Sequence, residues 1–201
     1  MRKSFILMKR HLFCAVAAAI LFAVLPLEAQ IRGFRQEQLK EWEFSKDGSN
    51  WETVAVPHSY NAEDGHSPYY YRGKATYRCD LRINDLKKTH YIFFEGAAQA
   101  AVVKVNGEQV ASHKGGYTPF SVNITEALRK GVNRIEVICD NSEDVDMIPV
   151  SSDFNKNGGL HNPVWLLVME DVYFSPEDYG IYRLRCETPE VTKKKVVTNV
   201  K

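Results

Sequence analysis

The residue types that most often carry chemistry are present, but their spacing matches no common catalytic or metal site. The sequence contains no Gly-rich phosphate loop and no His-Glu-x-x-His, Cys-x-x-Cys or Gly-x-Ser-x-Gly motif. The histidines beyond the N-terminal thirty residues are scattered without ligand spacing: His58, His66, His90, His113 and His161. We therefore expect no metal centre and no cofactor.

The carboxylates show no spacing typical of a glycosidase site, and the net charge argues against a nucleic-acid partner. A glycosidase needs two carboxylates held about 5 to 10 Å apart on a rigid scaffold, and no spacing in this sequence indicates such a pair. The chain has 26 basic and 25 acidic residues, for a net charge of +1. Because no basic surplus is available to neutralise phosphates, we do not expect a nucleic-acid partner.

The first thirty residues are typical of a secretory signal peptide. Basic residues near Arg2 and Arg10 precede an apolar run from Leu12 to Leu27, and Ala29 follows it. The run of about 16 residues is shorter than the ~20 that span a bilayer, which favours cleavage after Ala29 over a retained anchor. We expect residues 1–29 to be removed and the protein to be exported to the periplasm or the extracellular space, with no stable membrane span.

Cleavage would leave an odd number of cysteines, Cys79, Cys139 and Cys186. No two of them stand at metal-ligand spacing. An oxidising compartment permits one disulfide and leaves one thiol over. The preferred interpretation is that all three are small buried apolar residues on strands.

Short β-strands separated by turn residues dominate the rest of the chain. Between Ala75 and Ile83, apolar and polar residues alternate as in a half-buried antiparallel strand. Asn106-Gly107 separates two β-prone runs, which is the strongest short-range signal for a hairpin. The predicted strands cover Ala75–Ile83, Tyr91–Glu95, Ala100–Val105, Gln109–His113, Phe120–Ile124, Arg134–Cys139 and Val164–Met169.

The fold class that follows is all-β. One short helical segment is predicted, running from a Thr125 cap to Gly131. The number of strands and the turns between them are typical of a β-sandwich or a barrel. Trp51 and Trp165 are expected in the core because large apolar rings dominate cores, whereas Trp42 is less constrained.

Several motifs occur in a fixed order along the chain. The first group is WETVAVPH at residues 51–58, followed by Asn61, Asp64 and Gly65. The second is YRGKATYR at residues 71–78. The third group comprises Phe94-Glu95-Gly96, Val105-Asn106-Gly107, HKGGYTPF at residues 113–120, Ile124-Thr125, Gly131-Val132-Asn133, and the segment from Asp153-Phe154 through Gly158-Gly159-Leu160 to Val164-Trp165-Leu166.

In this order the motifs resemble the N-terminal sugar-binding domain of family 2 glycoside hydrolases. That family includes β-galactosidases, β-glucuronidases and β-mannosidases. The resemblance covers roughly Trp42 to Arg185. It implies a jelly-roll β-sandwich of the galactose-binding type over residues 30–188, and residues 189–201 would be a linker and the truncated start of an immunoglobulin-like domain.

The resemblance also implies which residues contact sugar. Asp153 matches the acidic residue that reaches from this domain into the active-site pocket of the family's catalytic barrel. A carboxylate suits that position because it accepts strong hydrogen bonds from adjacent sugar hydroxyls. Asp64, Tyr71 and Arg72 lie on the loop that lines the same rim, although pairing within the protein is the preferred interpretation for them. No ligand spacing supports a metal ion near Asp153 or Asp64.

The chain departs from the family pattern in two respects. Where the family usually has Ile-Tyr-Arg-x-Val, this sequence reads Leu160-His161-Asn162-Pro163-Val164, so Asn162 replaces an arginine. The catalytic (β/α)8 barrel, with its Asn-Glu acid/base and its nucleophilic glutamate, is absent from these residues. We therefore expect this chain alone to be inactive, with the missing barrel as its partner.

Two functional hypotheses remain. The first is the carbohydrate-binding N-terminal domain of an exported family 2 enzyme, β-galactosidase-like, which supports the barrel and shapes the pocket for a terminal β-linked sugar. The second is a free-standing, lectin-like carbohydrate-binding module with no catalytic partner. Exposed aromatics from the run Tyr69-Tyr70-Tyr71 would favour the second hypothesis, and inward packing of these rings would remove its support.

Overall fold

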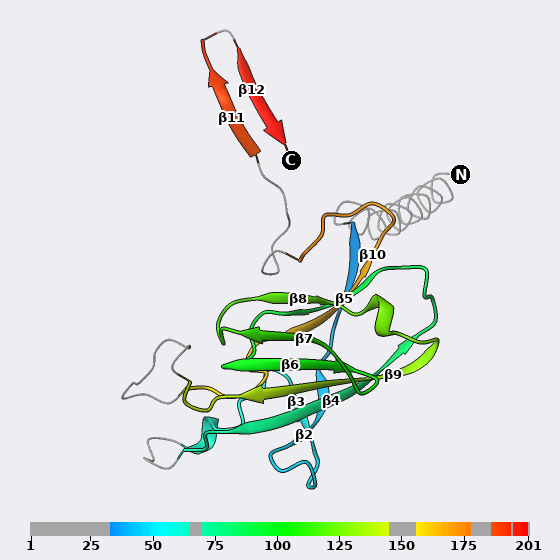
Figure 1. Cartoon of the computed structure of the whole chain (residues 1–201), viewed down its shortest axis with the longest axis vertical. Helices are drawn as coiled ribbons and strands as arrows, with labels where there is room; N and C mark the ends of the chain where they lie inside the picture. Colours follow the sequence, from blue (N-terminus) through cyan, green and yellow to red (C-terminus); the bar gives the residue numbers. More distant parts are fainter. Residues whose placement is uncertain (1–32, 65–69, 145–155, 178–185, 194, 201) are drawn as a thin grey trace, which may run out of the picture.

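The strands of the chain form a two-layer β-sandwich and one separate hairpin (Figure 1). A computed structural model describes residues 33–64, 70–144, 156–177, 186–193 and 195–200. The predicted signal segment, residues 1–29, lies outside the described residues. No helix in the described part of the chain is long and apolar enough to cross a membrane.

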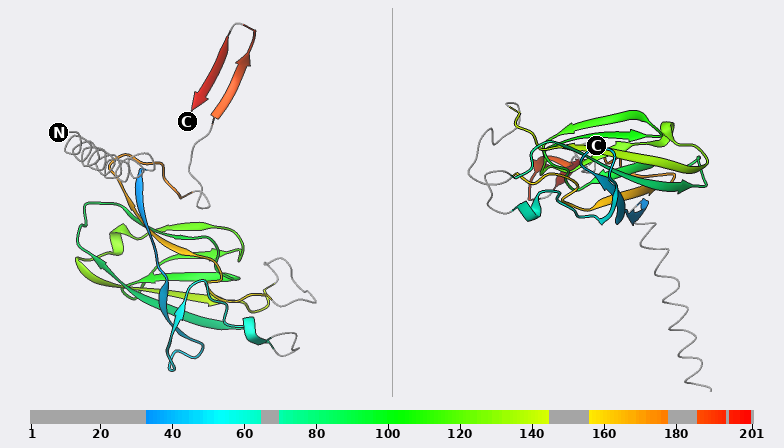
Figure 2. Two further views of the ribbon diagram at one scale, coloured as in Figure 1. Left: turned by 180° about the vertical axis from the view of Figure 1, so that it is seen from behind. Right: turned by 90° about the horizontal axis from the view of Figure 1, so that it is seen from below.

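The two layers are antiparallel sheets of unequal size, seen from below in the right-hand view of Figure 2. The larger has the order β3-β2-β4-β9-β6-β7, with bounds β2 Glu41–Ser45, β3 Glu52–Ala55, β4 Lys74–Ile83, β6 Ala100–Val105, β7 Glu108–Lys114 and β9 Gly131–Asp140. The smaller has the order β1-β10-β5-β8, with bounds β1 Phe34–Gln38, β5 His90–Phe94, β8 Phe120–Asn123 and β10 Val164–Met169.

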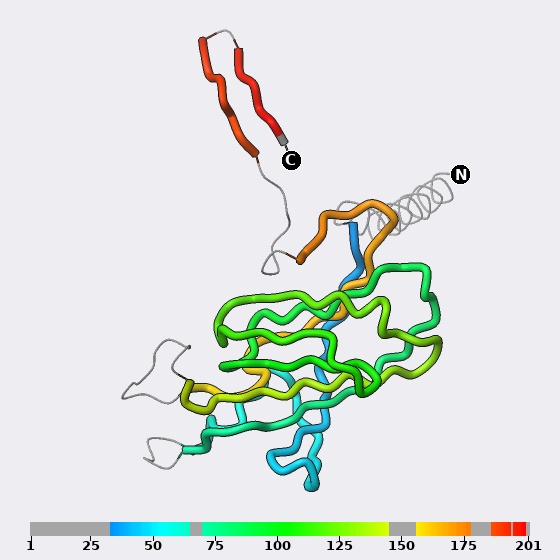
Figure 3. The backbone as a smooth tube through the Cα atoms, viewed as in Figure 1, coloured from blue at the N-terminus to red at the C-terminus, as the bar shows by residue number. Residues whose placement is uncertain are grey.

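After β4 the chain repeatedly crosses between the sheets, as can be followed in Figure 3. This path accords with the jelly-roll sandwich that the resemblance implied. The strands predicted from alternation are confirmed, with shifts of one to three residues at some ends. Three strands were not predicted, β1, β2 and β3, which are short and rich in polar residues.

The core lies between the two sheets and is built by alternate residues of each strand. On β4, Ala75, Tyr77, Leu81 and Ile83 all face inward and are buried, as predicted. The tryptophan prediction is wrong. Trp42 is the core tryptophan, only 1% exposed, with its indole N–H donating to the carbonyl of Leu39. Trp51 and Trp165 are half-buried near the surface.

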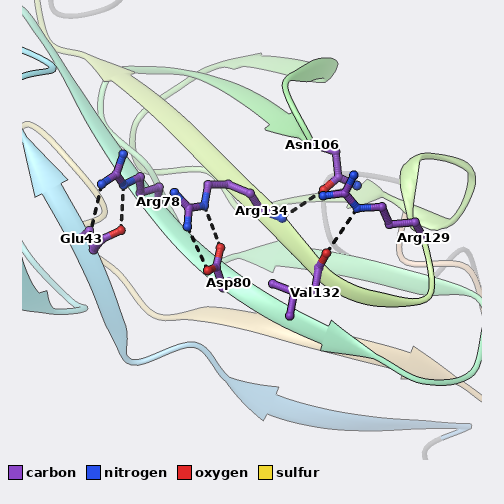
Figure 4. Close-up of polar contacts among 7 residues, drawn as sticks. All are labelled: Glu43, Arg78, Asp80, Asn106, Arg129, Val132 and Arg134. Carbon is purple, nitrogen blue, oxygen red and sulfur yellow. Dashed lines mark hydrogen bonds and ion pairs between the residues drawn. The ribbon is translucent and has the colours of Figure 1, made fainter.

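The predicted hairpin at Asn106-Gly107 joins β6 to β7. Both residues have positive φ, 54° and 90°, as the tightest hairpin turns require. The Asn106 side chain also fastens this turn to its neighbours. Its amide nitrogen donates to the Ala127 carbonyl at 3.0 Å, and its oxygen accepts from the Arg134 backbone N–H at 3.1 Å (Figure 4).

The predicted helix from Thr125 to Gly131 is only a 3-10 turn, η2, over Thr125–Ala127. Ile124 occupies the cap position, and no side chain caps the turn. The Thr125 hydroxyl instead accepts a hydrogen bond from the backbone N–H of His90 at 3.0 Å. A contact with a strand of the smaller sheet has replaced the local cap that the sequence indicated.

The outer face of the larger sheet is covered by charged side chains of alternating sign (Figure 4). Arg134 on β9 binds the Asp80 carboxylate on β4 through two bonds of 2.7 and 2.9 Å. Arg78 on β4 binds Glu43 on β2 at 2.7 Å. Because exposed ion pairs contribute at most about 1 kcal/mol each, this face is polar and solvated and adds little stability.

The cysteine prediction is partly wrong. Cys139 is buried, Cys79 is half-buried and Cys186 is exposed, and all three are free thiols in the structure. Burial raises the pKa of Cys79 to about 12, so this thiol is unreactive at neutral pH. Cys186 is the first residue of β11, Cys186–Val191, which pairs with β12, Val196–Val200, in a hairpin. Residues 189–191, which were expected to begin a linker, are therefore part of a strand.

Candidate functional site

One end of the sandwich gathers the loops that carry the predicted site residues. The register pairs Lys74 with Asp140 and Ala100 with Asp140, so β4 and β6 begin, and β9 ends, at the same end. The 3-10 turn η1, Ala62–Asp64, lies there too, at the left of Figure 1. We call this the loop end and define it as residues 56–64, 70–73, 141–144 and 156–163.

Two buried side-chain amides join these loops. Asn61 and Asn141 both donate to the carbonyl of Lys156, at 2.8 and 3.1 Å. Asn141 also donates to the carbonyl of Tyr71 at 3.2 Å, and Asn61 approaches the same oxygen at 3.5 Å. We call this group, the two amides with the carbonyls of Tyr71 and Lys156, the amide hub. It connects segments that lie far apart in the sequence.

The acceptor oxygens of the amide hub are used as well. Asn61 Oδ1 accepts from the backbone N–H of Gly158 at 3.0 Å, and Asn141 Oδ1 accepts from that of Gly73 at 2.8 Å. The two asparagines are 3% and 0% exposed. A buried amide with both its donor and its acceptor bonded holds its partners in one geometry, because any movement would leave a polar group unpaired.

Two glycines let the chain after Lys156 lie directly against a wall of tyrosines. A Cβ on Gly158 would stand 2.2 Å from the ring of Tyr60, and one on Gly159 would stand 2.2 Å from the hydroxyl of Tyr77. Gly159 also has a φ of +108°, which side chains rarely tolerate. This segment can therefore pack here only because these two positions lack side chains.

The tyrosine wall is itself tied to both loops. The hydroxyl of Tyr60 donates to the carbonyl of Gly73 at 2.9 Å, and the hydroxyl of Tyr77 lies 2.8 Å from His58 Nδ1. Burial raises the pKa of both hydroxyls, so they stay protonated and able to donate. The wall thus fixes the loop end from the core side.

Asp64 and Tyr71 are brought together, as the resemblance implied, but they first serve each other. Asp64 Oδ2 accepts from the backbone N–H of Tyr71 at 2.7 Å. The ring of Tyr71 packs edge-on against Tyr60, and its hydroxyl donates to the carbonyl of Lys74 at 2.7 Å. Tyr70 and Tyr71 are both half-buried, so neither is a fully exposed aromatic as the lectin-like hypothesis requires, and Tyr69 lies outside the described residues.

Arg72 links the two sides of the loop end. Its guanidinium stacks on the ring of Tyr70, 4.7 Å from the ring centre, and hydrogen-bonds the Tyr70 hydroxyl. It also forms an ion pair with the Glu143 carboxylate, which belongs to the segment following β9. On the other flank of that segment, Lys114 pairs with Asp144 at 2.9 Å. The segment 141–144 is therefore held from both sides.

Asp153 lies outside the described residues, so its predicted role as a sugar ligand remains a prediction. Asn162, which replaces the family arginine, donates to the carbonyl of Glu95 at 3.3 Å. The sequence motifs include Asn61 but not Asn141. The available signal was an asparagine directly after the last residue of an apolar, alternating strand, because a buried strand end needs a polar partner for its neighbouring backbone groups.

The described histidines lie apart from one another. Among the residues that the structure describes, no three His, Cys, Asp or Glu side chains lie close enough together to hold an ion. His58, His90, His113 and His161 are instead separate and partly buried, and burial lowers the pKa of each. His66 lies outside the described residues.

The buried histidines predict a loss of stability in mild acid. Their pKa values are lower in the folded protein than the value of about 6.5 for an unfolded chain, so the unfolded chain binds more protons as the pH falls through 6.5. The free energy of unfolding should therefore fall between pH 7.5 and 5.5, measured by urea titration. The lowered pKa values of Glu43 and Asp80 add to this loss only below about pH 4.5.

A matched control separates this effect from general acid sensitivity. His90→Gln should show a smaller fall in stability over the same range, since one imidazole that resists protonation has been removed. An unfolding free energy that is unchanged between pH 7.5 and 5.5 in the unsubstituted protein would contradict the assignment of these histidines as buried and neutral.

The amide hub predicts a large effect from one substitution. Asn141→Ala leaves the Gly73 N–H without its acceptor and removes one donor each from the carbonyls of Tyr71 and Lys156. Each unpaired buried group costs about 1–3 kcal/mol. We expect the free energy of unfolding to fall by about 3 kcal/mol. Asn123→Ala, at an exposed asparagine with two hydrogen bonds, should cost at most about 1 kcal/mol. Equal losses in urea unfolding would show that the hub has no special role.

Comparison with known proteins is consistent with this architecture. Residues 42–194 match the family described as "Glycosyl hydrolase 2 galactose-binding domain-like". A putative β-glucuronidase of Formosa agariphila is 32% identical over 165 residues, covering 80% of this chain and 19% of that protein. A β-galactosidase of Thermoanaerobacter pseudethanolicus is 34% identical over 161 residues, covering 75% of this chain and 21% of that protein.

Solved structures show the same relationship. A putative β-galactosidase from Bacteroides fragilis superimposes with a TM-score of 0.74 at 32% identity, over 84% of this chain and 28% of that one. A β-glucuronidase of Bacteroides uniformis gives a TM-score of 0.73 at 28% identity, over 83% of this chain and 22% of that one. The chain spans only about a fifth of the length of the curated relatives it matches. It belongs to the family of galactose-binding-like domains found in family 2 glycosyl hydrolases.

Proposed function

We propose that this chain is the sugar-binding N-terminal domain of an exported, β-galactosidase-like family 2 glycoside hydrolase. In the whole enzyme it would support the catalytic barrel and shape the pocket for a terminal β-linked sugar. The observation that carries the proposal is the amide hub. Through Asn61, Asn141 and the Lys156 carbonyl it joins the loop of Asp64, Tyr71 and Arg72 to both flanks of the segment that contains Asp153.

The covalent chain limits where Asp153 can act. Only two residues lie between it and Lys156, whose carbonyl is fixed by two asparagines, so three Cα–Cα steps join them. Consecutive Cα atoms are 3.8 Å apart, so the Cα of Asp153 stays within about 11 Å of that of Lys156. A carboxylate within this reach of the loop end would meet a sugar bound there, and it would accept hydrogen bonds from two neighbouring hydroxyls.

The exposed charges at and beside the loop end favour a neutral terminal sugar over an acidic one. At the loop end Arg72 faces the carboxylate of Glu143, and beside it Lys114 faces that of Asp144, whereas the remaining cation, Lys156, is buried. A uronate needs a cation whose charge is not already matched, because its carboxylate must be paired when water is excluded. We therefore place a β-galactoside first and a β-glucuronide second, although relatives of both kinds match this chain.

Catalysis would belong to the barrel. Retaining hydrolysis uses two carboxylates about 5 Å apart, one as acid/base and one as nucleophile. In the proposed enzyme both would be barrel glutamates, and this domain would contribute only to binding. The two described tyrosines of the run Tyr69-Tyr70-Tyr71 give the free-standing lectin-like alternative little support, because Tyr71 packs against Tyr60 and Arg72 stacks on Tyr70.

The two ends of the chain fit the same proposal. Residues 1–29 would direct export and be removed, so N-terminal sequencing of the exported protein should begin at Gln30. The hairpin β11–β12 would start the next domain. A two-stranded hairpin is marginally stable by itself, and Val191 and Val196 on it are 70% and 62% exposed, which suits strands that await partners. An unprocessed N-terminus on the exported protein would contradict the signal-peptide assignment.

The proposal is tested by hydrolysis and binding measured on the same sample. The chain should not hydrolyse aryl β-glycosides, and calorimetry with the matching methyl β-glycosides should show at best millimolar binding. Asp153→Asn should weaken sugar binding at the loop end, because an amide accepts fewer hydrogen bonds than a carboxylate. Glu177→Gln, at a carboxylate that binds Tyr91 on the smaller sheet, is the matched control. Clear turnover by the chain would overturn the proposal.

A further inference from the structure

A hollow of about 330 Å³ lies beside the loop that joins β2 to β3. Its lining includes Lys46, Asp47, Asn50, Trp51 and Glu52, and we call it the edge hollow. The volume lies at the lower end of the range for small-molecule sites, which suits one sugar ring. One indole ring and several hydrogen-bonding groups meet there, a combination typical of carbohydrate sites.

Trp51 is held in a fixed orientation. Its indole N–H donates to the carbonyl of Gly48 at 3.2 Å. The guanidinium of Arg78 lies 3.6 Å from the ring centre, and Arg78 is itself bound to Glu43 (Figure 4). Arg78 lies over one face of the indole and is not among the residues that line the edge hollow, whereas Trp51 is. The cation holds the ring from one face, so a sugar ring stacked on Trp51 would use the opposite face.

The loop that forms the hollow is ordered by a single carboxylate. Asp47 Oδ1 accepts from the Ser45 hydroxyl and from the backbone N–H groups of Ser49 and Asn50, at 2.8–3.0 Å. Asp47 Oδ2 accepts from the side-chain amide of Asn50 at 2.6 Å. These bonds hold the pKa of Asp47 well below its usual range, so it is ionised at any physiological pH. A site ordered before binding loses less entropy when a ligand arrives.

The polar groups of the hollow suit hydroxyls rather than a carboxylate ligand. A carboxylate oxygen can accept two hydrogen bonds, so Asp47 Oδ2 can accept another from a ligand. The amide oxygen of Asn50 and the carboxylate of Glu52 are further acceptors, and Lys46 is a donor. With one cation, Lys46, and two anions, Asp47 and Glu52, the lining carries a net charge of −1 (1 − 2 = −1). An anionic sugar would be repelled.

We propose that the edge hollow binds one neutral pyranose unit, stacked on Trp51 and hydrogen-bonded by Asp47, Asn50 and Lys46. The hollow adjoins the loop end, because the Lys46 ammonium lies 5.1 Å from the ring centre of Tyr71. A glycan whose terminal sugar occupies the loop end can therefore place a further unit in the hollow. This last step rests on the proposed function, whereas sugar binding by the hollow does not.

The test follows the three indole N–H signals of the full chain by NMR during titration with methyl β-D-galactopyranoside. Trp51→Phe and Trp165→Phe assign the signals, since the chain has three tryptophans. The Trp51 signal should shift and saturate in the millimolar range, and the Trp42 and Trp165 signals should not move. Methyl β-D-glucuronide should bind about fivefold more weakly, as one like-charge contact near the surface costs about 1 kcal/mol.

Two variants decide the outcome. Followed by the side-chain amide signals of Asn50, which also lines the hollow, galactoside binding should be at least about tenfold weaker in Trp51→Ala. Trp165→Phe, at a half-buried tryptophan outside the hollow, should leave it unchanged. Glu52→Lys changes the lining charge from −1 to +1 (−1 + 2 = +1) and should reverse the preference toward the glucuronide. Unchanged binding by a folded Trp51→Ala protein would overturn the proposal. If that variant fails to fold, an unchanged preference in Glu52→Lys overturns it.

The same titration separates this inference from the proposed function. Asp153→Asn alters the loop end and should leave the shift of the Trp51 signal intact. A protein in which Asp153→Asn has no effect, yet the Trp51 signal still saturates, would retain the edge hollow and refute the loop-end site. A protein in which neither sugar moves the Trp51 signal would lose the edge hollow and leave the loop-end proposal standing.

Discussion

The carbonyl oxygen of Lys156 accepts hydrogen bonds from two buried asparagine amides, and the arrangement of the loop end depends on it. A carbonyl has two lone pairs, so both of these are used and the oxygen needs no water. Because Asn61 and Asn141 come from opposite directions along the chain, neither loop can move without unpairing the other's partner. Buried hydrogen bonds thus hold distant segments of the chain together here, as disulfides do in many small exported domains.

The structure shows which features a single sequence can reveal. Alternation found β4, and Asn106-Gly107 found the β6–β7 turn, because both signals depend only on near neighbours. Asn141 escaped detection because its partners, at Lys156 and Tyr71, lie 15 and 70 residues away. Thr125 was misassigned as a helix cap for the same reason, since its hydroxyl contacts His90, 35 residues away in the sequence.

The tryptophans illustrate a second limit. Residue type says that an indole tends to be buried, but not which of three indoles fills the core. Trp42 does so because it stands on an inward position of β2, a strand that the sequence did not predict. Trp51 remains near the surface because Arg78 supplies a cation for one ring face. Of the predicted site, Asp64, Tyr71 and Arg72 do gather at one end, although their first partners are within the protein.

Gly158 and Gly159 limit which substitutions the backbone of the loop end can tolerate during evolution. A methyl group on Gly159 would displace the Tyr77 hydroxyl from His58, and Tyr77 is fully buried at the centre of the larger sheet. A substitution in the loop would therefore be felt in the core, where most changes are harmful. Substitution is consequently easier at side chains such as Arg72 and Glu143, which project from this fixed backbone, than in the backbone itself.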